Sequence, residues 1–316
     1  MAGREFWFAL ASIDGIGPMR IKRLVNRFGS VDKVFDAELS EIARIPLFNP
    51  LLATRILKTG IRIAEFRHHI KWFKSRGIEI FCLEDEDYPK QLKAIPNAPA
   101  ILCRKGNLSK VSQQSVAIVG TTKPTDDGIL ATLGLARHLV ETGFTVVSGL
   151  AQGIDTSAHV GVVEASGQTI GVIGSDLFSI HSHENRILAD QICENGAIFS
   201  EHPFTTLPTS ANLIQRNRII SGLSVATIVV ESEENGGAIR TAQFAREQGR
   251  LVFACRWQNR HRLSEGPHYL IQQQGALPIS LPISLDALDK VVEILKDPDS
   301  LRSRSTEASV EQMELF

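Results

Sequence analysis

The spacing of hydrophobic residues changes near residue 115. Before that point, residues 6–73 carry apolar side chains at helical spacing, and glycines and prolines interrupt the pattern. We predict a small all-α unit of short helices there. Two short apolar runs follow at 78–83 and 100–103. We predict that both are strands and that they extend one edge of the next domain.

From residue 115 the chain repeats a unit of apolar run, glycine-containing turn and amphipathic stretch. The apolar runs cover 116–119, 145–147, 169–173, 197–199, 227–230 and 251–254. They are continuous rather than alternating, which is typical of strands buried on both faces of a parallel sheet. The pattern therefore predicts an α/β fold with a doubly wound, mostly parallel sheet.

These patterns divide the chain into four parts. Residues 1–75 form the helical unit, 76–114 the edge extension, 115–280 the α/β domain, and 281–316 one helix near 285–295 with a flexible polar tail. Hydrophobic residues make up 43% of the chain and charged residues 22%, as in soluble globular proteins. No apolar run is long enough to span a membrane, and the first residues lack the apolar core of a secretory signal. We expect a cytoplasmic protein that does not bind membranes.

The net charge of −1 argues against a protein that coats nucleic acid through bulk electrostatics. Residues 1–114 carry 19 basic and 12 acidic side chains, whereas residues 115–280 carry 11 and 15. A binding site for a polyanion in the α/β domain must therefore be local. The four cysteines and nine histidines show no complete set of metal ligands, so we expect no metal.

Open α/β sheets bind ligands beyond the carboxyl ends of their strands, near the point where the strand order reverses. Three glycine-containing turns occupy such ends, and each opens a helix whose free amides favour a phosphate. A fourth segment carries two arginines, whose guanidinium groups match phosphate geometry. The candidate phosphate-binding residues are Gly120, Thr121, Thr122, Lys123, Ser148, Gly149, Gln152, Gly153, Asn212, Arg216, Asn217, Arg218, Asn235, Gly236 and Gly237.

The helical unit contains a second candidate site. Gly15 and Gly17 lead into a segment that carries Arg20 and Arg23, a pattern that resembles a helix-hairpin-helix. Free amides at the start of such a helix suit a backbone phosphate. A degenerate copy that serves only protein contacts is the alternative.

Two nucleotide signatures are missing. The sequence has no GxGxxG after a strand and no GxxxxGK[ST], so we expect no dinucleotide cofactor and no ATP hydrolysis. Asp155, Glu201 and Glu231 lie near predicted strand ends and could act as acid or base, but helix capping and other structural roles are favoured for them.

Several of these motifs together resemble the DprA/Smf family of DNA-processing proteins. The resemblance rests on VAIVG at 116–120, VSGLAQGIDTSAH at 147–159, RNRIISGLS at 216–224 and VVE at 229–231, and it covers roughly residues 5–280. It implies an extended Rossmann-like domain that binds single-stranded DNA, preceded by the helix-hairpin-helix or SAM-like module. It also implies a homodimer that loads a RecA-type recombinase in recombination or transformation, without enzymatic activity or a cofactor.

The sequence departs from this family's pattern at three places. Thr122 stands where the family has an arginine, with Lys123 next to it. The turn at 235–237 reads Asn-Gly-Gly instead of Ser-Gly-Ser, and residues 213–214 read Leu-Ile instead of Phe-Pro. The family's C-terminal winged helix is not expected, because residues 281–316 are too few to form one.

Two alternatives remain open at this stage. The departures suit a paralogue that acts as regulator or antitoxin in a toxin–antitoxin or phage-defence pair, with a cognate toxin as partner. The other alternative is a phosphoribohydrolase-like enzyme that cleaves nucleotides, with Glu231 and the turn at 235–237 as its active site.

Two further partner sites are predicted from the C-terminal part of the chain. Tyr269, Leu270 and Ile271 are candidate contacts of a two-fold dimer interface. The last five residues resemble the short motif by which bacterial replication and repair proteins bind the DNA sliding clamp. Its candidate contacts are Gln312, Met313, Leu315 and Phe316.

Overall fold

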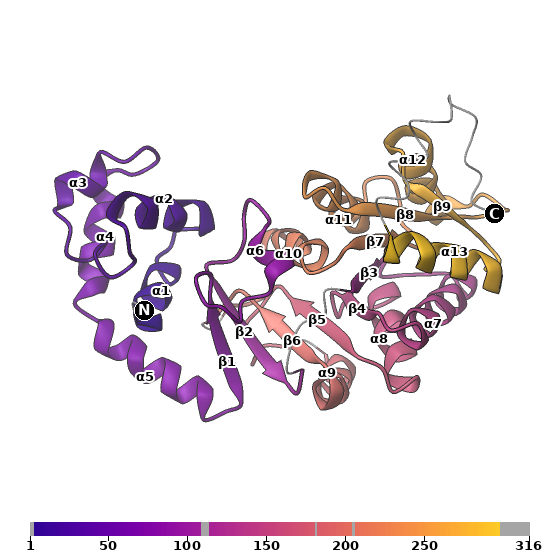
Figure 1. The fold of residues 1–316 in the computed structure, drawn as a ribbon, viewed down its shortest axis with the longest axis horizontal. Helices are drawn as coiled ribbons and strands as arrows, with labels where there is room; N and C mark the ends of the chain where they lie inside the picture. The colour runs from indigo at the N-terminus through magenta and orange to yellow at the C-terminus, as the bar shows by residue number, and fades with distance from the viewer. Residues whose placement is uncertain (1–2, 109–113, 181, 204–205, 298–316) are drawn as a thin grey trace.

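The computed structural model describes residues 3–108, 114–180, 182–203 and 206–297. It shows a helical unit at one end and a large α/β domain at the other (Figure 1). The predicted fold class is confirmed. The C-terminal pentapeptide that resembles a clamp-binding motif lies outside the described residues.

The helical unit consists of five short helices. They are α1 (Arg4–Ala11), α2 (Pro18–Phe28), α3 (Leu39–Ala43), α4 (Pro50–Gly60) and α5 (Ile63–Lys74). Proline begins both α2 and α4, where its missing amide would have no helical partner anyway. Gly29 ends α2 with a left-handed backbone, φ 85°.

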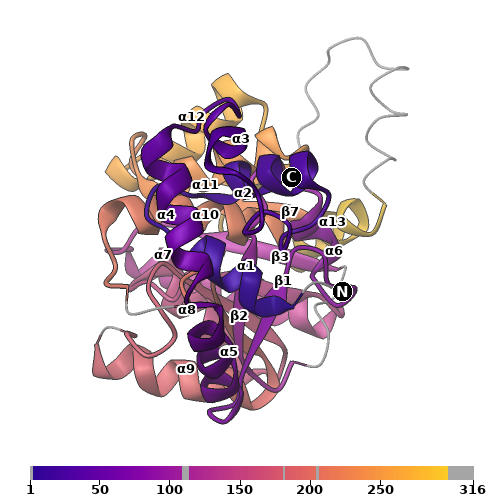
Figure 2. The ribbon, with the colours of Figure 1, turned by 90° about the vertical axis from the view of Figure 1, so that its left-hand side faces the viewer.

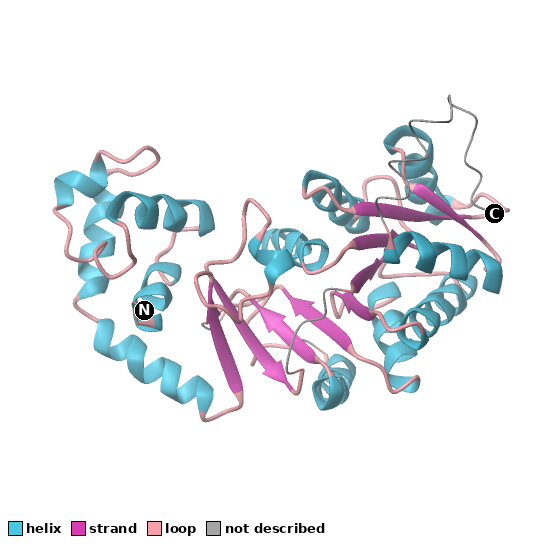
Figure 3. Ribbon diagram, viewed as in Figure 1, coloured by secondary structure: helices cyan, strands magenta, loops and turns pink. Residues whose placement is uncertain are grey.

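The α/β domain contains one nine-stranded sheet (Figure 3). Its strands in spatial order are β1 (Ile78–Cys82), β2 (Ile101–Gly106), β6 (Ala197–Ser200), β5 (Thr169–Ile173), β4 (Thr145–Ser148), β3 (Ser115–Val119), β7 (Ala226–Val229), β8 (Leu251–Arg256) and β9 (Leu277–Ser280). The seven strands β3 to β9 all run parallel to one another, whereas β1 pairs antiparallel with β2, and β2 pairs antiparallel with β6. The sequence pattern did not predict β9.

Helices cover both faces of the sheet. One face carries α7 (Asp126–Glu141), α8 (Ile154–Glu164), α9 (His183–Asn195) and α13 (Leu285–Lys296). The other face carries the short α6 (Lys90–Lys93), α10 (Ser210–Gly222), α11 (Gly237–Glu247) and α12 (Glu265–Gln274), with the 3₁₀ turn η1 (Arg262–Ser264) before α12. Val291 and Leu295 of α13 belong to the same cluster of buried residues as Ile118 of β3, so this helix is part of the core of the α/β domain.

The helical unit shares a hydrophobic core with the edge of the sheet. Phe8 of α1 contacts Phe73 of α5 with ring centroids 5.7 Å apart. The same cluster of buried residues continues into Ile80 of β1 and Cys103 of β2. Figure 2 shows α1 and α5 in front of this edge. None of the described helices is both long and apolar enough to cross a membrane.

The strand order reverses between β3 and β7. The chain builds β4, β5 and β6 outward on one side of β3 and then returns through α10 to place β7 on the other side. The carboxyl ends of β3 and β7 are joined there, because the Thr121 amide donates to the Glu231 carbonyl at 2.7 Å. A crevice at this reversal is the expected ligand site of such a sheet.

Candidate functional site

A cavity of about 440 Å³ lies at the reversal of the strand order. We call it the Arg216 cleft. Residues from the turn after β3, the first half of α10 and the start of α11 line it. They are Val119, Gly120, Thr121, Thr122, Ala151, Asp155, Leu213, Ile214, Arg216, Asn217, Ile220, Ser232, Glu233, Gly236, Gly237, Ala238 and Thr241.

A nearly buried cation forms part of the wall of this cleft. The Arg216 side chain comes from α10 and is only 5% exposed. One terminal nitrogen donates to the Val172 carbonyl at 2.5 Å, and Nε has no partner among the described residues. Because Arg216 lines the cleft, its positive charge favours an anionic ligand there.

Asp155 is the charge that balances Arg216. Its carboxylate accepts a hydrogen bond from the Gly149 amide at 3.1 Å. Burial raises the pKa of Asp155, and the Arg216 cation opposes that rise. Burial in turn lowers the pKa of Arg216, and Asp155 counteracts the change. Position 149 must be glycine, since a Cβ there would lie 2.6 Å from Cζ of Arg216.

The amide groups around the cleft come from a closely packed turn and an open helix end. A Cβ at position 120 would lie 2.9 Å from the Glu231 carbonyl oxygen, so only glycine lets β3 turn here. Helix α11 has no side-chain cap at Gly236, and a Cβ on Gly237 would meet nothing within 4 Å. The first amides of α11 therefore have no side-chain cap, and the positive end of the helix dipole lies at the cleft.

The other candidates in the α/β domain fall into two groups. Lys123 lines an adjoining hollow of about 460 Å³ together with Arg262, which pairs with Glu233 at 2.8 Å. Ser148 and Gly153 lie behind the cleft walls, whereas Gln152, Asn212 and Asn235 lie outside the lining. The structure thus brings Gly120, Thr121, Thr122, Arg216, Asn217, Gly236 and Gly237 together and leaves the remaining candidates around them.

Arg218 does not lie in the cleft, contrary to our expectation of a phosphate ligand. Two residues along a helix turn the side chain by about 200°, so Arg216 and Arg218 point to nearly opposite sides of α10. Both terminal nitrogens of Arg218 donate to Glu201, at 2.8 and 2.6 Å, and its Nε donates to the Asn97 carbonyl at 3.0 Å. The guanidinium is 4% exposed, so Arg218 is a structural cation.

Glu231 is also absent from the cleft lining. Its carboxylate is fully buried and accepts hydrogen bonds from the amide and the hydroxyl of Thr125, at 2.9 and 2.6 Å. His261 Nε2 lies 3.7 Å from the same carboxylate. The phosphoribohydrolase alternative requires Glu231 to act as acid or base beside the turn at 235–237. Glu231 is buried outside the cleft, so it does not fill that role.

Sequence reasoning missed two apolar residues as parts of the site. Leu213 and Ile214 line the cleft with 41% and 43% of their surface exposed. Position 213 is one turn before Arg216 and Asn217 on α10, and this i, i+3, i+4 spacing could have placed all of them on one face.

The two remaining candidate sites are the helix-hairpin-helix turn and the predicted dimer contacts. Arg20 donates to the Gly15 carbonyl, closing the turn before α2, and Arg23 donates to the Pro46 carbonyl at 3.4 Å. Leu270 is 1% exposed within the core under α12, so it is not available as a dimer contact. Tyr269 and Ile271 are half-buried at the edge of the same cluster.

Comparison with known proteins agrees with this architecture. Residues 79–286 match the family described as DNA recombination-mediator protein A, and residues 9–59 match the SAM-like helix-hairpin-helix tandem. Protein Smf of Escherichia coli is 33% identical over 286 residues, which is 89% of this chain and 74% of that protein. DNA processing protein DprA of Bacillus subtilis is 37% identical over 239 residues, covering 72% and 80%. Protein Smf of Synechocystis is 35% identical over 260 residues, covering 80% of this chain and 65% of the relative.

The solved structures that are similar to this chain include two of DNA processing proteins. DprA from Streptococcus pneumoniae superposes with a TM-score of 0.75 at 30% identity, covering 88% of this chain and 95% of that one. DNA processing protein A from Helicobacter pylori, described for its single-stranded DNA binding mode, superposes with a TM-score of 0.61 at 26% identity, covering 70% and 96%.

The buried ion pair between Arg218 and Glu201 should contribute to the stability of the fold. We expect Arg218→Met to lower the free energy of unfolding by about 3–5 kcal/mol, because Glu201 would remain buried without its cation. Adding Glu201→Leu to that variant should restore much of the loss. Urea unfolding of the three proteins measures both effects, and an Arg218→Met protein as stable as the wild type would contradict the structural role.

His159, which lies behind the cleft, makes a prediction about pH. The Thr169 hydroxyl donates to the Val146 carbonyl at 2.8 Å, so it must accept from His159 Nδ1–H, also at 2.8 Å. His159 Nε2 has no partner among the described residues. Burial, and then repulsion by Arg216, lowers the pKa of His159 from 6.5 to about 3.

Between these two pKa values the unfolded chain binds a proton that the folded chain excludes. The stability is therefore fully present above pH 6.5 and falls as the pH drops toward 3, by up to about 1.4 kcal/mol per pH unit. We expect His159→Asn, which keeps a donor for Thr169, to flatten this dependence in urea unfolding. The raised pKa of Asp155 makes stability change with pH in the opposite direction, and it does so in the wild type and in the variant alike. An unchanged slope in His159→Asn would therefore refute the assignment to His159.

Proposed function

Because this chain belongs to the DprA/Smf family of DNA-processing proteins, we propose that it is a recombination mediator that binds single-stranded DNA in the Arg216 cleft. One observation carries the proposal: the Arg216 side chain, the turn after β3 and the N-terminal end of α11 line one cavity at the reversal of the strand order. This arrangement fits one phosphate group of a nucleic acid backbone.

The burial of Arg216 favours a single strand over a duplex. A guanidinium that is 5% exposed is reached only by a chain that can enter the cleft, and a rigid double helix cannot bend its phosphates into a cavity of this size. Leu213 and Ile214 on the rim offer apolar contacts to unstacked bases. Apolar contacts beside a cationic groove are common features of single-strand binding.

The further partners of the proposal follow from the family. We propose that the protein loads a RecA-type recombinase onto the bound strand, and that it acts as a homodimer through the surface around Tyr269 and Ile271. The clamp-binding role of the C-terminal pentapeptide stays a prediction from the sequence. The protein has no enzymatic step in this scheme, and the burial of Glu231 against Thr125 supports that view.

Substitutions at the cleft test the DNA-binding proposal. We expect Arg216→Gln to weaken the binding of a single-stranded oligonucleotide at least tenfold, because the buried charge is lost. Lys123→Ala should lower the slope of log affinity against log salt by about 0.7, the value of one phosphate contact. Fluorescence anisotropy over a salt series measures both quantities, and competition with duplex DNA measures strand preference.

Lys296→Ala on α13 is the matched control for the loss of a surface lysine, since Lys296 is exposed and lies outside the cleft. Thermal unfolding shows whether Arg216→Gln remains folded. Unchanged affinity and an unchanged salt slope in both cleft variants would refute the site.

We expect the protein to form a homodimer in solution. Light scattering at micromolar concentration should give twice the chain mass of 34.7 kDa. Tyr269→Glu should shift the mass to that of one chain, because a charge would be buried at the two-fold contact. A wild-type mass of 34.7 kDa at these concentrations would count against the dimer.

A further inference from the structure

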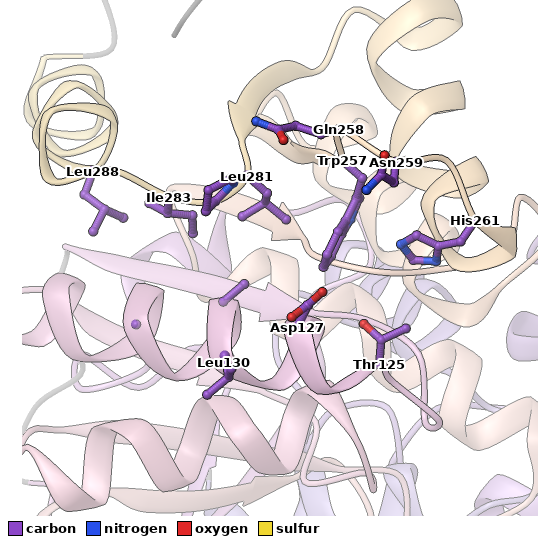
Figure 4. A pocket seen from close by; sticks show the side chains of 13 residues that line it. Thr125, Asp127, Leu130, Trp257, Gln258, Asn259, His261, Leu281, Ile283 and Leu288 are labelled. Atoms are coloured by element: carbon purple, nitrogen blue, oxygen red, sulfur yellow. The ribbon is translucent and has the colours of Figure 1, made fainter.

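A second cavity lies on the opposite face of the sheet from the Arg216 cleft. We call it the Trp257 pocket, and its volume is about 590 Å³ (Figure 4). Its walls come from the first half of α7, the segment after β8 and the segment that leads from β9 into α13. The lining residues are Thr125, Asp127, Leu130, Ala131, Gly134, Trp257, Gln258, Asn259, His261, Leu281, Pro282, Ile283 and Leu288.

The indole ring of Trp257 is held in one orientation. Its Nε1 donates to the Val230 carbonyl at 3.1 Å, and the His261 ring meets it edge-on with centroids 5.0 Å apart and an interplanar angle of 82°. Figure 4 shows the indole between the His261 side and the apolar side chains of Leu281 and Ile283, with Asp127 at its lower end. The ring is therefore a fixed surface on which a planar group can stack.

The polar groups of the pocket select against phosphate. No lysine or arginine is among its lining residues, and the acidic Asp127 is. Asp127, Gln258 and Asn259 are exposed, and their side chains make no hydrogen bond or ion pair with another described residue. An ionised carboxylate only accepts hydrogen bonds, so a ligand beside Asp127 must present N–H or O–H donors.

A glycine keeps the pocket open. Gly134 lies in the middle of the sixteen-residue helix α7, where glycine costs about 1 kcal/mol relative to alanine. A Cβ at this position would meet nothing within 4 Å, so no steric conflict requires glycine. Gly128 in the same helix differs, because a Cβ there would lie 2.6 Å from the Glu231 carboxyl carbon. The empty space at position 134 is thus volume that a ligand can fill.

The Trp257 pocket and the proposed DNA site both adjoin the hollow that Lys123 lines. This hollow shares Thr121, Thr122 and Glu233 with the Arg216 cleft, and it shares His261 with the Trp257 pocket. A strand whose backbone passes Lys123 and Arg262 therefore has both cavities within reach of neighbouring nucleotides.

We propose that the Trp257 pocket binds one nucleobase, stacked on Trp257 and donating N–H groups to Asp127. Guanine fits best, because its N1–H and N2–H groups are adjacent donors that match the two oxygens of a carboxylate. The base comes either from the bound strand, which rests on the proposed function, or from a free nucleoside, which does not.

Guanosine titration of the full chain tests the chemistry without phosphate. We expect saturable quenching of the intrinsic tryptophan fluorescence, absent in Trp257→Phe. Gly134→Leu should weaken guanosine binding at least tenfold, because the side chain fills the cavity while α7 gains a better helix former. Asp127→Asn should weaken guanosine at least tenfold, whereas Asp126→Asn, which makes the same charge change outside the lining, should not.

An oligonucleotide of thymines with one central guanine identifies the source of the base. If the strand supplies the base, Gly134→Leu also lowers the affinity for this oligonucleotide, and it lowers it more than the affinity for an oligonucleotide of thymines alone. If a free nucleoside is the ligand, Gly134→Leu weakens guanosine and leaves oligonucleotide binding unchanged. Guanosine that fails to bind at millimolar concentration, or binds Gly134→Leu as well as the wild type, overturns the proposal. The affinity of Lys123→Ala for the same oligonucleotides tests the DNA site separately. An unchanged affinity there would count against the proposed function and not against the Trp257 pocket.

Discussion

The electrostatic balance between Arg216 and Asp155 is the constraint on which the site depends. Both groups are buried at the carboxyl edge of the sheet, where neither charge is stable without the other. Gly149 lies directly beneath them, and its amide completes the coordination of Asp155. The turns after β3 and β4 and the direction of α10 must therefore all adopt one arrangement around this pair, which places Arg216 in the wall of the cleft.

This arrangement explains how a domain with an excess of acidic residues can offer a site for an anion. In the proposed site, the attraction comes from one nearly buried guanidinium and the positive end of one helix dipole. A charge in such a place acts more strongly than the same charge on an open surface. The acidic residues elsewhere are screened by solvent and have little effect on it.

The sequence predicted the sheet well because strands buried on both faces leave continuous apolar runs between glycines. It did not predict β9, because Pro278 and Pro282 interrupt the apolar run that would indicate a strand. β9 lies at the edge of the sheet, where proline is tolerated. Arg218 was misplaced because motif reasoning treats neighbouring arginines alike, whereas the helix separates them and Glu201 is 17 positions away. Leu270 was misplaced because a short apolar stretch does not reveal which side faces the core. The Trp257 pocket could not be predicted, because it joins residues from 125 to 288 that share no sequence pattern.

The hydrophobic core shared by the helical unit and the sheet edge changes how the chain is best divided. Phe8 and Phe73 pack in the same cluster as Ile80 and Cys103, although the composition suggests a boundary at residue 75. Separated at that point, each half would present a large apolar face to water, which favours aggregation. Because the two parts share this cluster, we expect the helical unit and the sheet to unfold together in one transition.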